Sequence, residues 1–206
     1  MVKRAFRTLL LFVCPCLILS ACGAGSTLHV PGDLTRSAHP SAPRAGAPQA
    51  VIADFAFAAA PDGVVGRDFD RARTIAWNGE PGKAMADLIA AVLAERGVVT
   101  VRRGADAQGA DAVPVRISGV LRRFEVNTRR TGNLTVVTEA VVNLAITVEG
   151  PGLSGSMEKT VTSSASLSDL FVTPDDLREA LLSTANTVAE EAARRLLEAK
   201  VVSPSP

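Results

Sequence analysis

The stretch NLTVVTEAVVNLAITVEG, residues 133–150, decides the fold predicted for this chain. Apart from Thr138, apolar side chains occupy the even positions from Leu134 to Val148, while Thr135, Glu139 and Asn143 are among the odd ones. A period of two residues is typical of a strand that buries one face and exposes the other. The pattern therefore predicts a long strand over about 134–148, with its even side chains in a core.

Two neighbouring segments predict the strands on either side. Residues 113–126 form an apolar stretch whose parity changes around Gly119, as a β-bulge would cause. The turn sequence EGPGLSG follows the decisive strand and leads into 157–167, where Met157 and Val161 share one side. Strands joined by such short turns favour antiparallel pairing.

Two helices are expected beside these strands. Pro81 suits a first helical turn, and Gly97 suits a helix end. Between them, apolar residues recur at helical spacing, at Met85, Leu88, Ile89, Val92 and Leu93. A second helix is predicted from an N-cap at Thr173 to about Ala199, with an apolar stripe that runs from Leu177 to Leu196.

Two shorter strands, VIADFAF at 51–57 and VVTVRR at 98–103, complete the set. The order strand, helix, four strands, helix predicts an α+β fold. We expect a mainly antiparallel sheet of about five strands with two helices packed on one face.

The long segment from Ala58 to Gly82 has two interpretations. It holds Phe69 and Trp77, the only tryptophan, and loops of that length are uncommon unless they have a function. The functional hypothesis is a loop that contacts a partner through Phe69 and Trp77. The alternative is a hairpin that folds Ile75 and Trp77 onto the core. Asp68 and Asp70 could form a carboxylate pair, but because they lie among arginines they are expected in a salt-bridged surface loop.

The N-terminus has the layout of an export signal. Lys3, Arg4 and Arg7 precede an apolar run that is too short to span a bilayer, which needs about 20 apolar residues. The residues LSAC, 19–22, resemble the lipobox of bacterial lipoproteins. That resemblance implies removal of residues 1–21 and acylation of Cys22 by diacylglycerol and a further acyl chain such as palmitate. Gly23 rather than Asp follows the cysteine, which by the same resemblance implies the outer membrane, periplasmic leaflet, or the cell membrane if the organism has only one.

The next residues are rich in Gly, Ser, Ala and Pro, and they include both histidines, His29 and His39. We expect residues 22–49 to be a flexible linker after the acylated cysteine, with a span on the order of 30 Å. Residues 50–202 are then expected to form a single α+β periplasmic domain.

Candidate chemistry in the folded region is sparse. It contains no histidine, tyrosine or cysteine, so neither a catalytic triad nor a transition-metal site is expected, and no cofactor is predicted. Without the signal peptide the chain has 19 basic and 21 acidic side chains. This balance does not predict a basic surface that would bind nucleic acid. An enzyme that uses carboxylates alone is the least favoured class.

Four arginines, Arg122, Arg123, Arg129 and Arg130, are expected around a hairpin tip, either simply solvated or in contact with anionic headgroups or an acidic partner.

Several segments together resemble a known family. The lipobox, VIADF, MADLIAAVLAERG, VPVRISGVLRRFEV and the C-terminal helix look like the YajG family of small bacterial lipoproteins. They also overlap the auxiliary lipoproteins of ABC-type lipid transport systems, which similarly place two helices on a small sheet. The resemblance implies a non-catalytic envelope lipoprotein that binds protein or lipid partners in the periplasm. The alternative is an auxiliary subunit of a lipid transporter.

Overall fold

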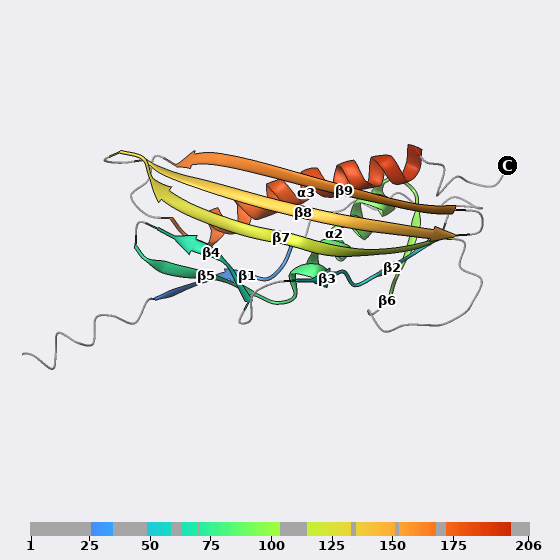
Figure 1. Cartoon of the computed structure of the whole chain (residues 1–206), viewed down its shortest axis with the longest axis horizontal. Coiled ribbons are helices and arrows are strands. Elements are labelled where there is room, and N and C mark those ends of the chain that lie inside the picture. The colour runs from blue at the N-terminus through green and yellow to red at the C-terminus, as the bar shows by residue number, and fades with distance from the viewer. Residues whose placement is uncertain are drawn as a thin grey trace, which may run out of the picture.

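The structure is a computed structural model that describes residues 26–34, 49–58, 63–69, 71–103, 115–132, 135–150, 153–167 and 172–198. Cys22 and the predicted signal peptide lie outside the described residues. The described residues form a nine-stranded mixed sheet and two helices, labelled in Figure 1. Among them, no helix combines the length and the apolar character that crossing a bilayer requires.

The three longest strands of the sheet are consecutive in the chain and antiparallel. They are β7 (Arg116–Arg130), β8 (Val136–Gly150) and β9 (Leu153–Leu167), each of 15 residues. The strand predicted at 134–148 is β8, and its even residues from Val136 to Val148 are all buried. The predicted bulge is present in β7, between Leu121 and Arg123 rather than at Gly119.

The other edge of β7 pairs with three short strands in succession. β2 (Gln49–Ala53), β3 (Ala56–Phe57) and β4 (Val64–Asp68) all run parallel to it. Beyond β2 lies β6 (Val99–Arg103), also parallel. Beyond β4 lie β5 (Arg73–Asn78), antiparallel to β4, and then β1 (Thr27–Pro31), parallel to β5.

The expected sheet was therefore wrong in size and in strand direction. About five mainly antiparallel strands were predicted, whereas the sheet has nine and contains five parallel pairings. Three strands, β1, β4 and β5, lie in segments that were expected to be linker or loop. Parallel pairing joins residues far apart in the chain, which local turn signals do not reveal.

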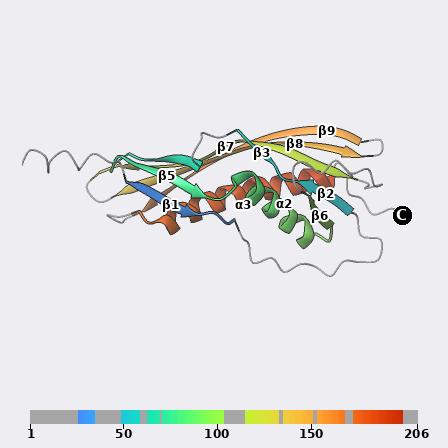
Figure 2. The ribbon, with the colours of Figure 1, turned by 90° about the horizontal axis from the view of Figure 1, so that it is seen from below.

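Two helices lie on the same side of the sheet, as Figure 2 shows. They are α2 (Pro81–Glu95) and α3 (Pro174–Glu198). In α2 the five predicted apolar residues are buried, and the helix ends before Gly97, whose φ of 84° suits a glycine. Gly82 is required at the start of α2, because a Cβ there would lie 2.0 Å from the carbonyl oxygen of Phe55.

The N-terminus of α3 carries a reciprocal cap. The backbone N–H of Asp176 donates to Oγ1 of Thr173 at 3.3 Å, and the N–H of Thr173 donates to Oδ2 of Asp176 at 2.8 Å. The stripe from Leu177 to Leu196 is buried against the sheet, as predicted. A single core therefore lies between the two helices and the inner face of the strands.

The segment expected to be a flexible linker at 22–49 is partly structured. Residues 27–31 are β1, and Val30 is fully buried. Beyond the strand, Asp33 accepts two bonds of 3.1 Å from Arg178 on α3. His29, predicted to be a solvated linker residue, is exposed, and its Nδ1 lies 3.0 Å from Oδ1 of Asn78. The first strand thus belongs to the folded domain.

Candidate interaction surface

The two candidate contact residues have opposite environments. Phe69 follows β4 at the turn to β5 and is 64% exposed, the largest exposure among the described large apolar side chains. Trp77 in β5 is 3% exposed, and its ring meets Phe124 edge-on with 5.0 Å between the centroids. The hairpin alternative is confirmed, because Ile75 and Trp77 both belong to the core. A partner contact by Trp77 is therefore wrong for this fold, while a contact by Phe69 stays a prediction.

Asp68 joins three strands next to Phe69. It is 4% exposed, not part of a surface loop as expected. Arg73 of β5 donates from Nε and Nη2 to its Oδ2 at 3.0 and 2.7 Å, and Thr128 of β7 donates to its Oδ1 at 2.9 Å. The network holds the β4–β5 hairpin on β7.

The electrostatics of Asp68 follow from these bonds. Burial by itself raises the pKa of the carboxyl group, because it disfavours the charged form. The hydrogen bonds from Arg73 and Thr128, together with the charge of Arg73, outweigh burial and hold the pKa below its ordinary value of 3.8. Asp68 is therefore ionised at neutral pH and has a structural role.

The four arginines grouped in the sequence occupy two places. Arg129 and Arg130 end β7 at the hairpin tip, as expected, and both are exposed. Arg122 and Arg123 instead lie in the middle of β7, at its bulge. There Arg123 pairs with Glu125 at 2.7 Å and Arg122 with Glu158 at 3.4 Å. Of the four, only Arg129 and Arg130 can therefore contribute to a surface at the tip.

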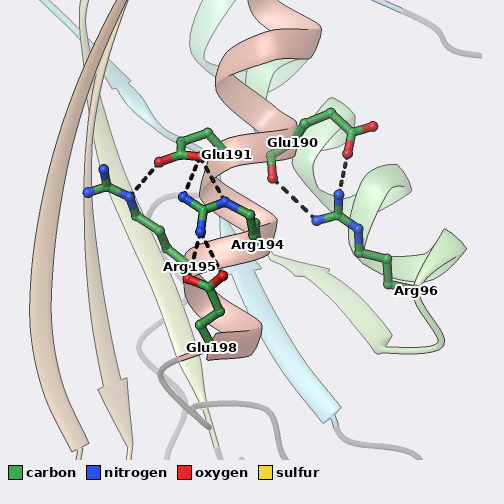
Figure 3. Close-up of polar contacts among 6 residues, drawn as sticks. All are labelled: Arg96, Glu190, Glu191, Arg194, Arg195 and Glu198. Carbon is green, nitrogen blue, oxygen red and sulfur yellow. Dashed lines mark hydrogen bonds and ion pairs between the residues drawn. The ribbon is translucent and has the colours of Figure 1, made fainter.

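A charged network covers the outer face of α3 near its C-terminal end (Figure 3). Arg194 bonds both Glu191 and Glu198, and Arg195 also bonds Glu191 at 2.7 Å. Hydrogen bonds from Arg194 and then Arg195 lower the pKa of Glu191. Arg96, just after α2, bonds Glu190, so the network also joins the two helices.

Two hollows lie on the helical side, and both have charged linings. One, of about 930 Å³, is open and follows the outer face of α3 beside Arg96 and Lys159. The other, of about 450 Å³, lies between the start of α2 and residues 32–34. Within the described ranges, no three His, Cys, Asp or Glu side chains are placed to share a metal ion.

The outer edge of β9 is long and regular. Its pairing with β8 has no register shift over 15 residues, and no described strand pairs with its other edge. The segment contains no proline and only two charged residues, Glu158 and Lys159. Proteins usually interrupt such edges with bulges, proline or charges, so a regular edge favours the addition of another strand.

Comparison with known proteins supports the fold alone. No family model matches the chain, and no curated protein does. The crystal structure of protein XCC0632 from Xanthomonas campestris, described with the family model DUF330, is similar at a TM-score of 0.56 and 13% identity. The match covers 84% of this chain and 96% of that one.

Two further structures are less similar. The crystal structure of an uncharacterised protein matches at a TM-score of 0.49 and 14% identity, over 84% of this chain and 98% of that one. A minor lipoprotein from Acinetobacter baumannii matches at 0.39 and 10% identity, over 76% of this chain and 96% of that one. The resemblance to the YajG family stays a prediction.

Sequence reasoning missed the surface that the fold assembles at one end of the molecule. There the turn after β4 carries Phe69 and the end of β7 carries Arg129, and the N–H of Phe69 donates to the carbonyl of Thr128 at 3.0 Å. β1 begins at the same end, because Thr27 is opposite Thr74. The two arginine-rich sequences RDFDRAR and NTRR were the available signal, but their proximity depends on the parallel pairing of β4 with β7.

Proposed function

We propose that the protein is a non-catalytic lipoprotein of the bacterial envelope, held to a membrane through acyl chains on Cys22 and acting by binding a protein or lipid partner. The observation that supports this proposal most strongly is the order of positive residues, apolar run and LSAC box at the N-terminus. A domain with the fold of XCC0632 follows it closely. Gly23 supports the outer membrane as the location.

The non-catalytic part of the proposal is supported by how the carboxylates are used. Asp68 holds three strands together, and Asp54 and Asp87 both pair with Arg102, between β2, α2 and β6. On the sheet surface, Glu125 and Glu158 pair with arginines of β7. Ion-paired carboxylates of this kind stabilise a fold and are poorly suited to proton transfer.

The edge of β9 supports binding of a protein partner, because its backbone offers hydrogen bonds to an added strand. The alternative role is that of an auxiliary subunit of an ABC-type lipid transporter. It is favoured by the two helices on one face of the sheet, the arrangement that the resemblance to those lipoproteins implies. A transporter gene beside this one would distinguish the two roles.

The anchor is tested by replacing Cys22. We expect Cys22→Ala to block acylation and to move the protein from the detergent phase to the aqueous phase, because each buried methylene contributes about 0.8 kcal/mol to membrane binding. Metabolic labelling with a palmitate analogue measures this directly, and Cys16→Ala in the signal segment is the matched control. Label that persists in Cys22→Ala would contradict the proposal.

A further inference from the structure

The start of β1, the β4–β5 turn and the β7–β8 turn lie at one end of the molecule. Across the sheet, Thr27 is opposite Thr74, Asp68 is opposite Arg73, and Asp68 is also opposite Thr128. The N-terminal end of β1, the β4–β5 turn, the end of β7 and the start of β8 therefore lie at the same end, at the left of Figure 1. The carbonyl of Ser26 accepts a hydrogen bond of 3.3 Å from the N–H of Thr74, which fixes the chain at that end.

The position of Ser26 limits how far Cys22 can lie from this end. Ser26 lies four positions after Cys22 in the chain, and a fully extended chain spans at most about 3.6 Å per residue. Cys22 is therefore within roughly 14 Å of Ser26. A linker of 22–49 would have allowed the domain to move well away from an anchored cysteine, whereas β1 holds this end close to it.

The chemistry of this end suits a phospholipid surface. Phe69 is 64% exposed, and aromatic side chains insert favourably between headgroups. The two turn sequences, 67–73 and 127–135, contain five arginines and two aspartates, and one of these, Asp68, is already paired with Arg73. Arg67 and Arg129 are exposed and make no ion pair with another described residue. Arginine next to an anionic leaflet is attracted to lipid phosphates within a Debye length.

We propose that this end is a bilayer-contact surface: Phe69 inserts among the headgroups of the membrane that carries the acyl chains, and Arg67 and Arg129 bind phosphates of anionic phospholipids. The inference rests on the proposed acylation of Cys22. It gives the anchored domain a fixed orientation, with the ends of β4 and β7 toward the membrane and α2 and β6 away from the contact.

Site-specific fluorescence on the mature protein in vesicles tests the orientation. If Cys22 is acylated, Phe69→Cys supplies the only reactive thiol for an environment-sensitive fluorophore. Val101→Cys is the matched control, because Val101 is also an exposed apolar residue, at 47%, but belongs to β6. The vesicles are phosphatidylcholine alone or mixed with phosphatidylglycerol, with a spin-labelled lipid as quencher, and mass spectrometry first establishes acylation.

We expect the fluorophore at Phe69→Cys to emit at shorter wavelength and to be quenched by the spin-labelled lipid, more strongly with phosphatidylglycerol, while that at Val101→Cys stays in water. Adding Arg67→Ser and Arg129→Ser should remove the phosphatidylglycerol dependence. An acylated protein whose two positions are quenched equally, or not at all, would overturn this inference and leave the anchor intact. An unacylated protein would overturn both, and quenching that ignores the arginines would overturn their role.

Discussion

Asp68 lies where β4 meets both β5 and β7, and its two carboxylate oxygens serve different strands. Oδ2 accepts from Arg73 and Oδ1 from Thr128. The sequence showed an aspartate among arginines, which is the usual composition of a solvated loop. Its burial depends on the parallel contact of β4 with β7, made by residues 60 positions apart, and no local pattern reports such a contact.

This arrangement predicts a pH-dependent stability. Because the folded pKa of Asp68 lies below 3.8, the unfolded chain binds the proton more readily. The stabilisation is therefore complete above the unfolded pKa and is lost as the pH falls through the folded pKa. We expect Asp68→Asn to lower the free energy of unfolding by roughly 3 kcal/mol at neutral pH, because it leaves Arg73 without its buried partner.

Urea unfolding of the two proteins at neutral pH and at about pH 3 measures this. The difference between wild type and Asp68→Asn should shrink at the lower pH. Asp175→Asn, at an exposed position in the first turn of α3, is the control and should change stability little at either pH. A difference that is independent of pH would show that the charge of Asp68 contributes nothing.

At the scale of elements, the sequence predicted the parts that have strong internal periodicity. In β8, α2 and α3 the predicted apolar residues that the structure describes are buried, and the bulge of β7 lies a few residues from its predicted position. β1 was missed because only Val30 of its five residues is buried and its surroundings are rich in Gly and Pro. β4 and β5 were considered only as the alternative to a contact loop.

The open edge of β9 makes a testable prediction for partner binding. In an antiparallel pair, successive residues direct their backbone N–H alternately toward and away from the neighbouring strand. Of Val161 and Thr162, one therefore donates toward β8 and the other points to the outer edge. Proline at the outward position is compatible with an edge strand, whereas proline at the inward position removes a bond of the β8–β9 ladder.

We expect one of the variants Val161→Pro and Thr162→Pro to keep the melting temperature near wild type and the other to lower it. The stable variant should lose the partner that co-purifies after cross-linking in the cell envelope, because it can no longer donate to an added strand. Thr162→Val, which keeps the backbone N–H, is the control. Retention of the partner by the stable proline variant would exclude the β9 edge as its binding site.

At the scale of the whole molecule, β1 decides how the domain relates to the proposed anchor. Composition alone predicted a flexible linker after Cys22, since Gly, Ser, Ala and Pro dominate residues 23–49. β1 forms a strand in spite of that composition, because it pairs with a strand of the sheet that lies much later in the chain. Its partner β5 begins at Arg73, 46 positions after Thr27, the first residue of β1. A short strand of this kind owes its structure to the rest of the fold, so its own sequence could not predict it.

The contribution of β1 can be measured through Val30. This side chain is fully buried in the core, so Val30→Asp would place an unpaired carboxylate there and should cost several kcal/mol, roughly 3 or more. Thr27→Asp changes an exposed residue of the same strand and should alter stability by less than about 0.5 kcal/mol. Denaturant unfolding of the mature chain, followed by the fluorescence of Trp77, measures both variants.

Because Trp77 is opposite Val30 in the pairing of β1 with β5, its emission also reports the loss of β1 locally, as a shift to longer wavelength before global unfolding. Equal stability and equal emission for the two variants would mean that β1 is not part of the folded domain, and the short distance between Cys22 and the sheet would then no longer hold.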